Sequence, residues 1–270
     1  KVFGFHPQVP SDPNVLTLES EIREIDAPQL LLRFSERANA DAFRDDSGYA
    51  NNGSCRGTAC PVSGHEGRYG NAPHFDGAGD YVTADDVCPD IAGADAITFG
   101  AWFYPEGGSS GDTIILAFNT ADGGNVLHLG FNAGTRTVYV TSPDHRIESY
   151  ALGLDQWHHT AVTVDAGGTA RLYVNGAQVG GLLPITVSPA TDHRFSIGQE
   201  WDGAAASNFF RGLIDEVLVF DHALTQAEIE EMQAGRYNPE DATVRPGDTL
   251  GYEATVKNEL FNSYAQGLLS

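Results

Sequence analysis

The chain has 270 residues, with 37 aspartate and glutamate residues against 15 lysine and arginine residues, and a formal net charge of −22. This charge excludes nucleic acid and anionic membranes as expected partners, because both attract basic proteins. No apolar run approaches the ~20 residues of a membrane-spanning helix, so membrane insertion is not expected either. The 31 glycines and the single methionine favour a loop-rich, secreted β protein.

Residues 1–28 predict an N-terminal extended arm. Prolines recur through this segment, and the apolar residues between positions 15 and 25 alternate imperfectly, which indicates one strand. The triplet 26–28 predicts a hinge, because the residue before a proline is pushed toward extended geometry.

From residue 29 onward the sequence predicts many short strands and almost no helical period. Glycine, asparagine and aspartate separate the strand-like stretches, and Asn175-Gly176 is a hairpin signal. This pattern predicts an all-β fold, an antiparallel two-sheet jelly-roll sandwich. The expected strands cover residues 29–34, 96–104, 113–118, 126–131, 137–141, 156–164, 170–174 and 195–198, with two short strands inside 74–82.

Residues 211–224 predict the central strand of the sandwich. Apolar residues occupy both parities of this stretch, as is typical of a strand buried on both faces. Asp215 and Glu216 lie inside it, and burying an ionised carboxylate without a partner costs several kcal/mol. Because adjacent side chains of a strand point to opposite faces, we expect one acid to face a metal ion or an arginine and the other to face water.

Residues 225–235 predict the one helix of the chain. Thr225 and Glu228 have the spacing of a capping box, in which each residue bonds the other's backbone N–H. Gly235 is expected to end the helix, since glycine readily adopts the left-handed conformation found after a last helical turn.

The three cysteines predict one disulfide. Cys55 and Cys60 lie five residues apart in a glycine-containing loop that can close into a small ring, which suits a secreted protein. Cys88 is then unpaired. A zinc site is the alternative, but no further ligands occur at a suitable spacing.

A series of short motifs runs in order through residues 34–237. They are Asp46-Ser47-Gly48, Asn52-Gly53, Gly70, Phe75-Asp76-Gly77, Asp80-Tyr81-Val82, Phe99 to Trp102, Gln156-Trp157-His158-His159, Leu172 to Gly176, Ile197-Gly198, Gly212 to Val217, Ala223-Leu224 and Glu228-Ile229. With these motifs the segment resembles a laminin-G-like, concanavalin A-like jelly-roll domain of the bacterial secreted type. The resemblance implies two curved antiparallel sheets, a structural calcium ion, and a role in adhesion or glycan binding; we place the domain at residues 29–238.

The resemblance also implies which residues bind calcium. Asp215 would supply its side chain, carbonyl groups near Ser35–Glu36 and Asn52–Gly53 would contribute, and Asp46 is a further candidate. Calcium accepts six to eight oxygen ligands, many of them main-chain carbonyls. The alternative is that Asp215 accepts hydrogen bonds from loop amides without a metal.

Two residues are candidates for binding a glycan. Trp201 lies in a polar loop with Asn208 close after it, and an exposed aromatic ring among amides and carboxylates can stack on a sugar. The alternative is that Trp201 anchors the loop. Trp102 and Trp157 lie in strand-like stretches and are expected in the core.

The sequence does not predict an enzyme. A glycosidase needs two carboxylates that face each other across one cleft, and no predicted strand carries the alternating acids that would provide them. His158 and His159 are adjacent, so their rings are expected on opposite faces of a sheet, in structural roles.

Residues 239–270 predict an incomplete domain. Residues 244–258 read as a turn and an alternating strand and resemble the opening of an immunoglobulin-like repeat of bacterial surface proteins, which needs about seven strands. We expect this tail and the N-terminal arm to pair with copies of the chain, or with neighbouring domains, by exchanging strands into a filament. Packing of both arms on their own domain, or a chain cut inside the next repeat, are the alternatives.

The function expected from these features is that of a non-catalytic, calcium-stabilised adhesion or structural module at a cell surface. The alternative is a carbohydrate-binding module, or a glycoside hydrolase or lyase on the same sandwich. Assay against polysaccharides, with and without calcium, distinguishes the hydrolase or lyase by turnover.

Overall fold

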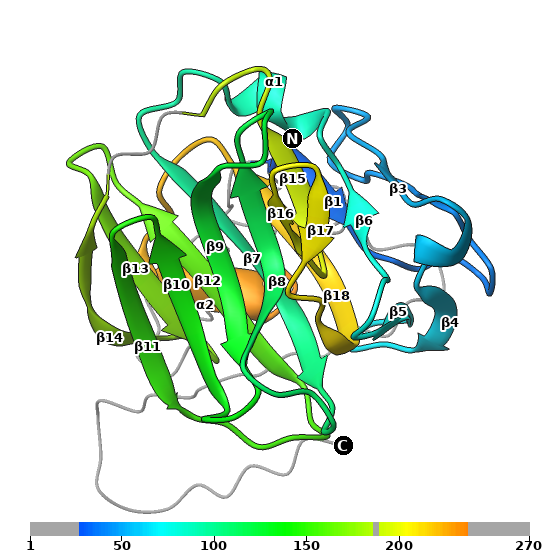
Figure 1. Cartoon of the computed structure of the whole chain (residues 1–270). Coiled ribbons are helices and arrows are strands. Elements are labelled where there is room, and N and C mark those ends of the chain that lie inside the picture. Colours follow the sequence, from blue (N-terminus) through cyan, green and yellow to red (C-terminus); the bar gives the residue numbers. More distant parts are fainter. Residues whose placement is uncertain (1–26, 186–188, 237–270) are drawn as a thin grey trace, which may run out of the picture. The chain divides into compact units, whose positions relative to one another are not determined.

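The computed structural model describes residues 27–185 and 189–236, and most of its strands form an antiparallel sandwich of two sheets (Figure 1). The predicted all-β jelly-roll fold is therefore confirmed. The described residues belong to one compact unit. The segments predicted to exchange strands, residues 15–25 and 239–270, lie outside the described residues.

The first sheet has the strand order β14-β13-β12-β7-β18-β5-β4, and β1 also pairs with β18. We call it the helix-covered sheet, because α2 (Gln226–Gln233) packs on its outer side. The central strand predicted over residues 211–224 is present as β18, which ends at Phe220 and has partners on both sides. The strands are β1 (Leu30–Leu32), β4 (Val62–Glu66), β5 (Asn71–Asp76), β7 (Ile97–Pro105), β12 (His158–Val164), β13 (Thr169–Val174), β14 (Ala177–Pro184) and β18 (Arg211–Phe220).

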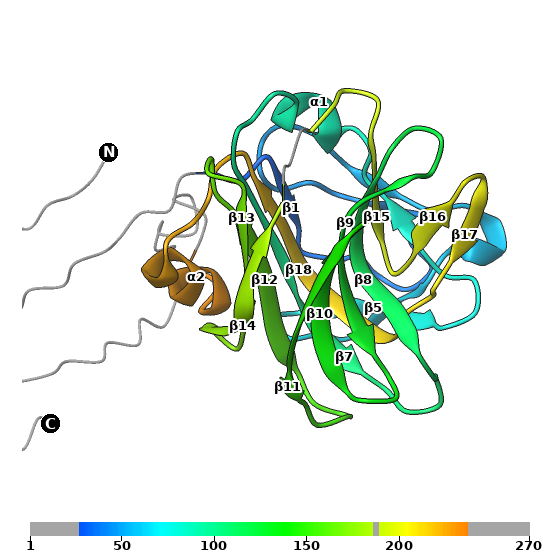
Figure 2. The ribbon, with the colours of Figure 1, turned by 60° about the vertical axis from the view of Figure 1, so that its left-hand side comes forward.

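The second sheet has the order β11-β10-β9-β8-β15-β6-β3-β2, and we call it the open sheet. Figure 2 shows α2 on one side of the sandwich and the short hairpin of β16 (Glu200–Asp202) and β17 (Ala205–Ser207) on the other. The strands of the open sheet are β2 (Ala42–Phe43), β3 (Gly53–Ser54), β6 (Val82–Thr83), β8 (Asp112–Asn119), β9 (Asn125–Asn132), β10 (Thr137–Ser142), β11 (His145–Ala151) and β15 (Arg194–Ile197).

The main core fills the space between the two sheets, and strand alternation builds it. On β10, Val138 and Val140 point into this core, whereas Tyr139 between them belongs to a separate outer cluster with Ile114 and Ala117. The same alternation on β18 places Leu218 and Phe220 outside the main core, against α2.

A β-bulge changes the alternation in the middle of β18. Ile214 and Val217 both belong to the main core although they are three residues apart, and the pairing with β7 shifts between Asp215 and Leu218. Glu216 has a φ of 50°, the left-handed conformation that favours glycine. The expectation that Asp215 and Glu216 simply alternate across the sheet is therefore wrong, because two residues occupy the place of one.

The predicted capping box and disulfide are both present. The Thr225 backbone N–H donates to Glu228 Oε2 at 2.6 Å, and the Glu228 N–H donates to Thr225 Oγ1 at 3.4 Å. Cys55 and Cys60 form a disulfide, and Cys88 is an unpaired, buried thiol whose pKa burial raises to about 12. Cys88 lies in a second short helix, α1 (Val87–Ile91), which was not predicted. A helix of five residues is too short to show a helical period in the sequence.

Candidate functional site

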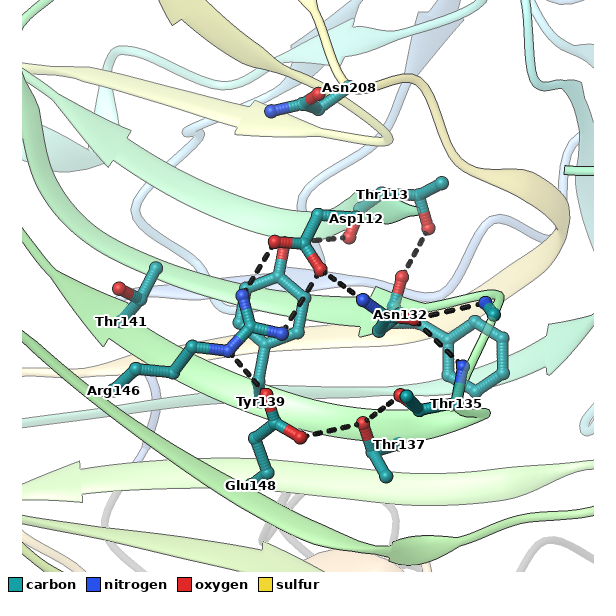
Figure 3. Close-up of polar contacts among 12 residues, drawn as sticks. Asp112, Thr113, Asn132, Thr135, Thr137, Tyr139, Thr141, Arg146, Glu148 and Asn208 are labelled. Carbon is teal, nitrogen blue, oxygen red and sulfur yellow. Dashed lines mark hydrogen bonds and ion pairs between the residues drawn. The ribbon is translucent and has the colours of Figure 1, made fainter. Parts of the chain in front are cut away.

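The outer surface of the open sheet carries a continuous polar network, which we call the open face and define by Asp112, Asn132, Thr137, Tyr139, Arg146 and Glu148. These residues come from β8, β9, β10 and β11, which are neighbours in the sheet. Figure 3 shows them grouped around the Arg146 side chain. Four consecutive strands, joined by short turns, thus contribute to one surface.

Tyr139 is the base of the open face. A Cβ atom on Gly130, its partner on β9, would lie 2.2 Å from the Tyr139 Cζ atom, so only glycine leaves room for the ring to cross this strand. The Tyr139 hydroxyl donates to the Thr113 carbonyl oxygen of β8 at 3.2 Å. The ring is therefore held flat across the sheet, with its hydroxyl hydrogen-bonded at the far end.

Arg146 stacks on this ring. Its guanidinium carbon lies 3.7 Å from the centre of the Tyr139 ring, a cation–π contact. Nη1 and Nη2 reach the two carboxylate oxygens of Asp112 at 2.6 and 3.0 Å, and Nε reaches Glu148 Oε1 at 2.7 Å (Figure 3). The planar cation is thus fixed from below by the ring and from its edges by two acids.

Amides and hydroxyls extend the network along the sheet. Asn132 Nδ2 donates to Asp112 Oδ1 at 2.7 Å, and Thr137 Oγ1 donates to Glu148 Oε2 at 3.2 Å. The pKa of Asp112 is lowered, chiefly by its hydrogen bond to Arg146, so this carboxylate stays ionised at neutral pH. The Asp112, Glu148 and Arg146 side chains therefore offer many acceptors and one cation.

A buried histidine–glutamate pair lies beside the open face. His128 Nε2 and Glu200 Oε2 are 3.6 Å apart, and both side chains are almost fully buried. Burial lowers the pKa of His128 to about 4, whereas burial and then Asp202 raise the pKa of Glu200. Asn208 Nδ2 donates to Glu200 Oε1 at 2.7 Å, so the end of the β16–β17 hairpin is tied to the same pair.

The candidate glycan platform, Trp201, is not exposed. Only 8% of the residue is accessible, its indole N–H donates to Ser196 Oγ at 2.9 Å, and Arg194 stacks on the ring at 3.4 Å. The ring therefore anchors the hairpin, which was the alternative. Asn208 is exposed, but its side chain bonds Glu200 and its carbonyl accepts from the Ile114 N–H at 2.8 Å.

Asp215 lies on the outer side of the helix-covered sheet, opposite Trp102 on β7. Its Oδ2 accepts from the Tyr69 N–H at 3.0 Å and its Oδ1 from the Glu216 N–H at 2.9 Å. Burial is the main influence on its pKa, which is raised to about 7. Asp215 thus has the amide partners that the metal-free alternative predicted.

The other proposed calcium ligands each have protein partners of their own. Arg33 lies 3.5 Å from Asp46 and 3.8 Å from Glu216, so an arginine is the cation that faces the second acid of β18. Asn52 Oδ1 accepts from the Asp45 N–H at 2.9 Å, and Gly53 is part of β3. The Ser35 and Glu36 carbonyls accept from Asn71 Nδ2 at 3.4 and 3.2 Å.

Two observations bear on whether this region fits a calcium ion. Glu36 Oε2 is buried without a hydrogen-bond partner, and the Asp215 carboxylate is desolvated, so both would gain from a cation. Within residues 27–185 and 189–236, however, no three acidic, histidine or cysteine side chains converge on one point. An ion near Asp215 and Glu36 would therefore rely on main-chain carbonyls for most of its ligands.

The strand geometry predicted that the rings of the two adjacent histidines lie on opposite faces, and they do. His158 pairs with Phe103 and His159 with Trp102 across β12 and β7, so their rings lie on opposite faces. His158 Nε2 lies 3.0 Å from the Gly153 carbonyl oxygen, and the His159 ring packs against Trp102. The two rings therefore have separate partners and do not act together.

The open face was not among the sites predicted from the sequence. One signal was available, since Thr137, Tyr139 and Thr141 alternate with apolar residues that fill the core. The partners of Tyr139 could not be found this way, because β11 was not predicted; it is an edge strand whose Ile147 alone packs on the core. Among the described residues, no helix is long and apolar enough to cross a membrane.

Residues 76–230 match the family model Laminin_G_3 of the concanavalin A-like lectin/glucanases superfamily. The chain belongs to this superfamily. No curated protein sequence matches it.

Solved structures share the fold at low sequence identity. Domain 4 of AbnA, a GH43 extracellular arabinanase from Geobacillus stearothermophilus in complex with arabinotriose, is 19% identical with a TM-score of 0.57, over 76% of this chain and 98% of that one. The receptor-binding domain of botulinum neurotoxin type G is 13% identical with a TM-score of 0.57, over 78% and 52%. A Trypanosoma rangeli sialidase is 15% identical with a TM-score of 0.52, over 76% and 32%. The chain thus spans about half of the toxin domain and a third of the sialidase.

Proposed function

We propose that this chain is a non-catalytic, extracellular recognition and adhesion module that binds a glycan on its open face. The observation that carries the proposal is the Tyr139–Arg146 stack, surrounded by amide, hydroxyl and carboxylate groups on the side of the sandwich opposite α2. The superfamily includes lectins by its description, and the arabinanase domain that shares the fold was solved with arabinotriose.

The open face has the two kinds of group that sugar binding requires. A flat, rigid surface packs against the C–H face of a sugar ring, and the stacked guanidinium of Arg146 is flat and held on several sides. Directional donors and acceptors fix the hydroxyl groups, and Asn132, Thr137 and the two carboxylates supply them.

The acids of the open face are unsuited to hydrolysis. A glycosidase needs one carboxylic acid with a raised pKa to protonate the leaving group, whereas Arg146 lowers the pKa of Asp112 and also binds Glu148. Glu200 has a raised pKa but is buried, with His128 beside it and Asn208 bonded to it. These arrangements favour binding without turnover.

Binding to immobilised polysaccharides, with parallel assay of released sugar, tests this function. Arg146→Ala should weaken binding by at least about tenfold, the size expected when one well-placed contact is removed. Arg171→Ala is the matched control, because it removes an arginine that pairs with Asp165 on the helix-covered sheet. Unchanged binding by the Arg146 variant, or sugar release by the wild-type protein, would contradict the proposal.

The disulfide supports an extracellular location, because disulfides persist in oxidising compartments. The test is whether Cys55 and Cys60 are oxidised in protein taken from its native source. Reduced thiols at both positions would argue against the proposed location.

We also propose that calcium stabilises the region around Asp215 and Glu36. The support is the unpartnered Glu36 Oε2 and the desolvated Asp215 carboxylate. A ligand that binds only the folded state adds about 2.7 kcal/mol at a hundredfold excess over its dissociation constant. Melting should therefore fall with chelator at matched ionic strength, and Asp215→Ala should remove the difference; an identical melt with and without chelator would contradict this.

We also propose that residues 15–25 and 239–270 join copies of the chain, or neighbouring domains, by strand exchange. The support is their alternating sequence and the presence of edge strands, β4 and β14 in one sheet and β11 and β2 in the other, to which a strand can add. Deleting residues 243–270 should leave a folded monomer and abolish self-association in sedimentation. A full chain that sediments as a monomer at high concentration would refute the proposal.

A further inference from the structure

Carboxylates already engage three of the five N–H groups of the Arg146 guanidinium. Its Nε and both Nη atoms already donate to carboxylates, two to Asp112 and one to Glu148. A carboxylate ligand that approached Arg146 would compete with two resident acids for these donors. An arginine in this state can support a sugar ring by stacking, but only two of its N–H groups are left for an acid.

The charges on the open face oppose an anionic ligand as well. Asp112 and Glu148 carry two negative charges against the one positive charge of Arg146, and burial of the Tyr139 hydroxyl raises its pKa, so that residue stays neutral. Both acids are accessible, with side-chain exposures of 37% for Asp112 and 41% for Glu148. An anion on this surface would therefore meet net negative charge.

The same two acids suit the hydroxyl groups of a neutral sugar. Carboxylate oxygens accept more than one hydrogen bond each, so Asp112 and Glu148 can bind Arg146 and still accept from a ligand. Thr137 and Asn132, which donate to these carboxylates, complete a surface rich in acceptors.

We infer that Asp112 and Glu148 make the open face selective for neutral over anionic glycans, by occupying Arg146 and by repelling acidic ligands. This inference rests on the proposed glycan function and adds the ligand class. It also identifies the residues that determine specificity: removing the two carboxylates while keeping their shape should turn Arg146 into an anion-binding group.

The test compares neutral polysaccharides (arabinan, xylan and dextran) with polygalacturonate as the anionic probe. The wild-type protein should bind a neutral polysaccharide and bind polygalacturonate at least about tenfold more weakly. The double variant Asp112→Asn with Glu148→Gln should gain at least about tenfold in affinity for polygalacturonate, and this gain should fall with added salt. Adding Arg146→Gln should abolish the gain.

The control is Asp165→Asn with Glu231→Gln, which changes the net charge equally but at acids paired with Arg171 and Arg236. An equal gain in this control would mean that total charge alone matters, and would overturn the inference. So would a folded double variant that gains no polygalacturonate binding, or a wild-type protein that binds polygalacturonate as tightly as a neutral polysaccharide.

Two further readouts keep the result decisive. If the double variant does not fold, Asp112→Asn alone gives the same readout with a smaller expected gain. If the wild-type protein binds no neutral polysaccharide, the proposed function fails, whereas the polygalacturonate series with and without Arg146 still decides whether the two acids block the arginine.

Discussion

The two outer faces of the sandwich differ in what covers them. On the helix-covered sheet, Leu31, Leu218 and Phe220 pack with Ile229 and Met232 of α2 into an apolar cluster. On the open sheet, the equivalent outward positions carry the Tyr139–Arg146 stack and its ring of polar groups. One face therefore contributes stability by burying apolar surface, and the other leaves its polar groups available to a ligand.

This difference follows from which residues occupy the outward positions of each sheet. Strand alternation makes an outer face available on each sheet, and the residues at those positions decide whether it needs a cover. An apolar outer face requires the helix, whereas a polar outer face is stable in water without one. Substitutions on the covered face should therefore mainly change the free energy of unfolding, and substitutions on the open face should mainly change ligand binding.

The largest expected effect is on the covered face. Ile229→Ala should lower the free energy of unfolding by about 2–5 kcal/mol, because it leaves a cavity beneath α2. Leu182→Ala on β14 is the matched control, since 57% of that residue is exposed, and it should cost less than about 0.5 kcal/mol. Denaturant unfolding of both variants checks this; equal losses would mean that α2 is not a structural cover.

Asp215 is the polar exception on the covered side, and its effect should depend on pH. Its pKa is raised to about 7 from 3.8, so the stability that its protonated form contributes is complete below about pH 4 and is lost as the pH rises through 7. Wild-type protein in chelator should thus lose roughly 2–4 kcal/mol over this range relative to Asp215→Asn. Parallel stability curves for the two proteins would contradict the assignment, and calcium should flatten the wild-type curve.

The Cys55–Cys60 disulfide belongs to neither face, and its removal should have an effect of intermediate size on stability. Closing so short a loop restricts the unfolded chain, and removing it should cost about 2 kcal/mol. Cys55→Ser with Cys60→Ser should lower the melting temperature without changing glycan binding. A double serine variant that loses binding would show that the open face depends on this loop.

The smallest stability effect is expected on the open face itself. Thr137→Val removes the hydroxyl that donates to Glu148 while keeping a β-branched side chain in the strand. We expect a change of less than about 1 kcal/mol in unfolding, together with weaker glycan binding. A large loss of stability would mean that the polar network mainly supports the fold.

Features set by local sequence could be predicted, and those set by strand pairing could not. The capping box of Thr225, the disulfide loop and the apolar parity of residues 211–220 each need only nearby residues, and each is present. The bulge at Glu216 could not be foreseen, because a positive φ at glutamate is imposed by pairing on both sides and leaves no mark in the sequence.

The candidate site also depends on strand pairing, so even less of it could be predicted from the sequence. Trp201 looks exposed in a polar loop, yet Ser196 and Arg194 on a neighbouring strand bury and bind it. Arg146 and Asp112 are 34 residues apart, and only the order of β8 to β11 in the open sheet brings them together. A site assembled across four strands is a property of topology, which single-sequence patterns do not contain.

Chemical-shift mapping with a neutral oligosaccharide identified by the binding panel tests the central claim most directly. The largest shifts are expected on Asn132, Tyr139 and Arg146 of the open face, with none at Ile229 or Met232 beneath α2. Another surface offers a clear alternative: the groove lined by Asn125, His145 and His193 at the ends of the strands. Shifts confined to that groove, or to the covered face, would contradict the claim that the open face is the binding site.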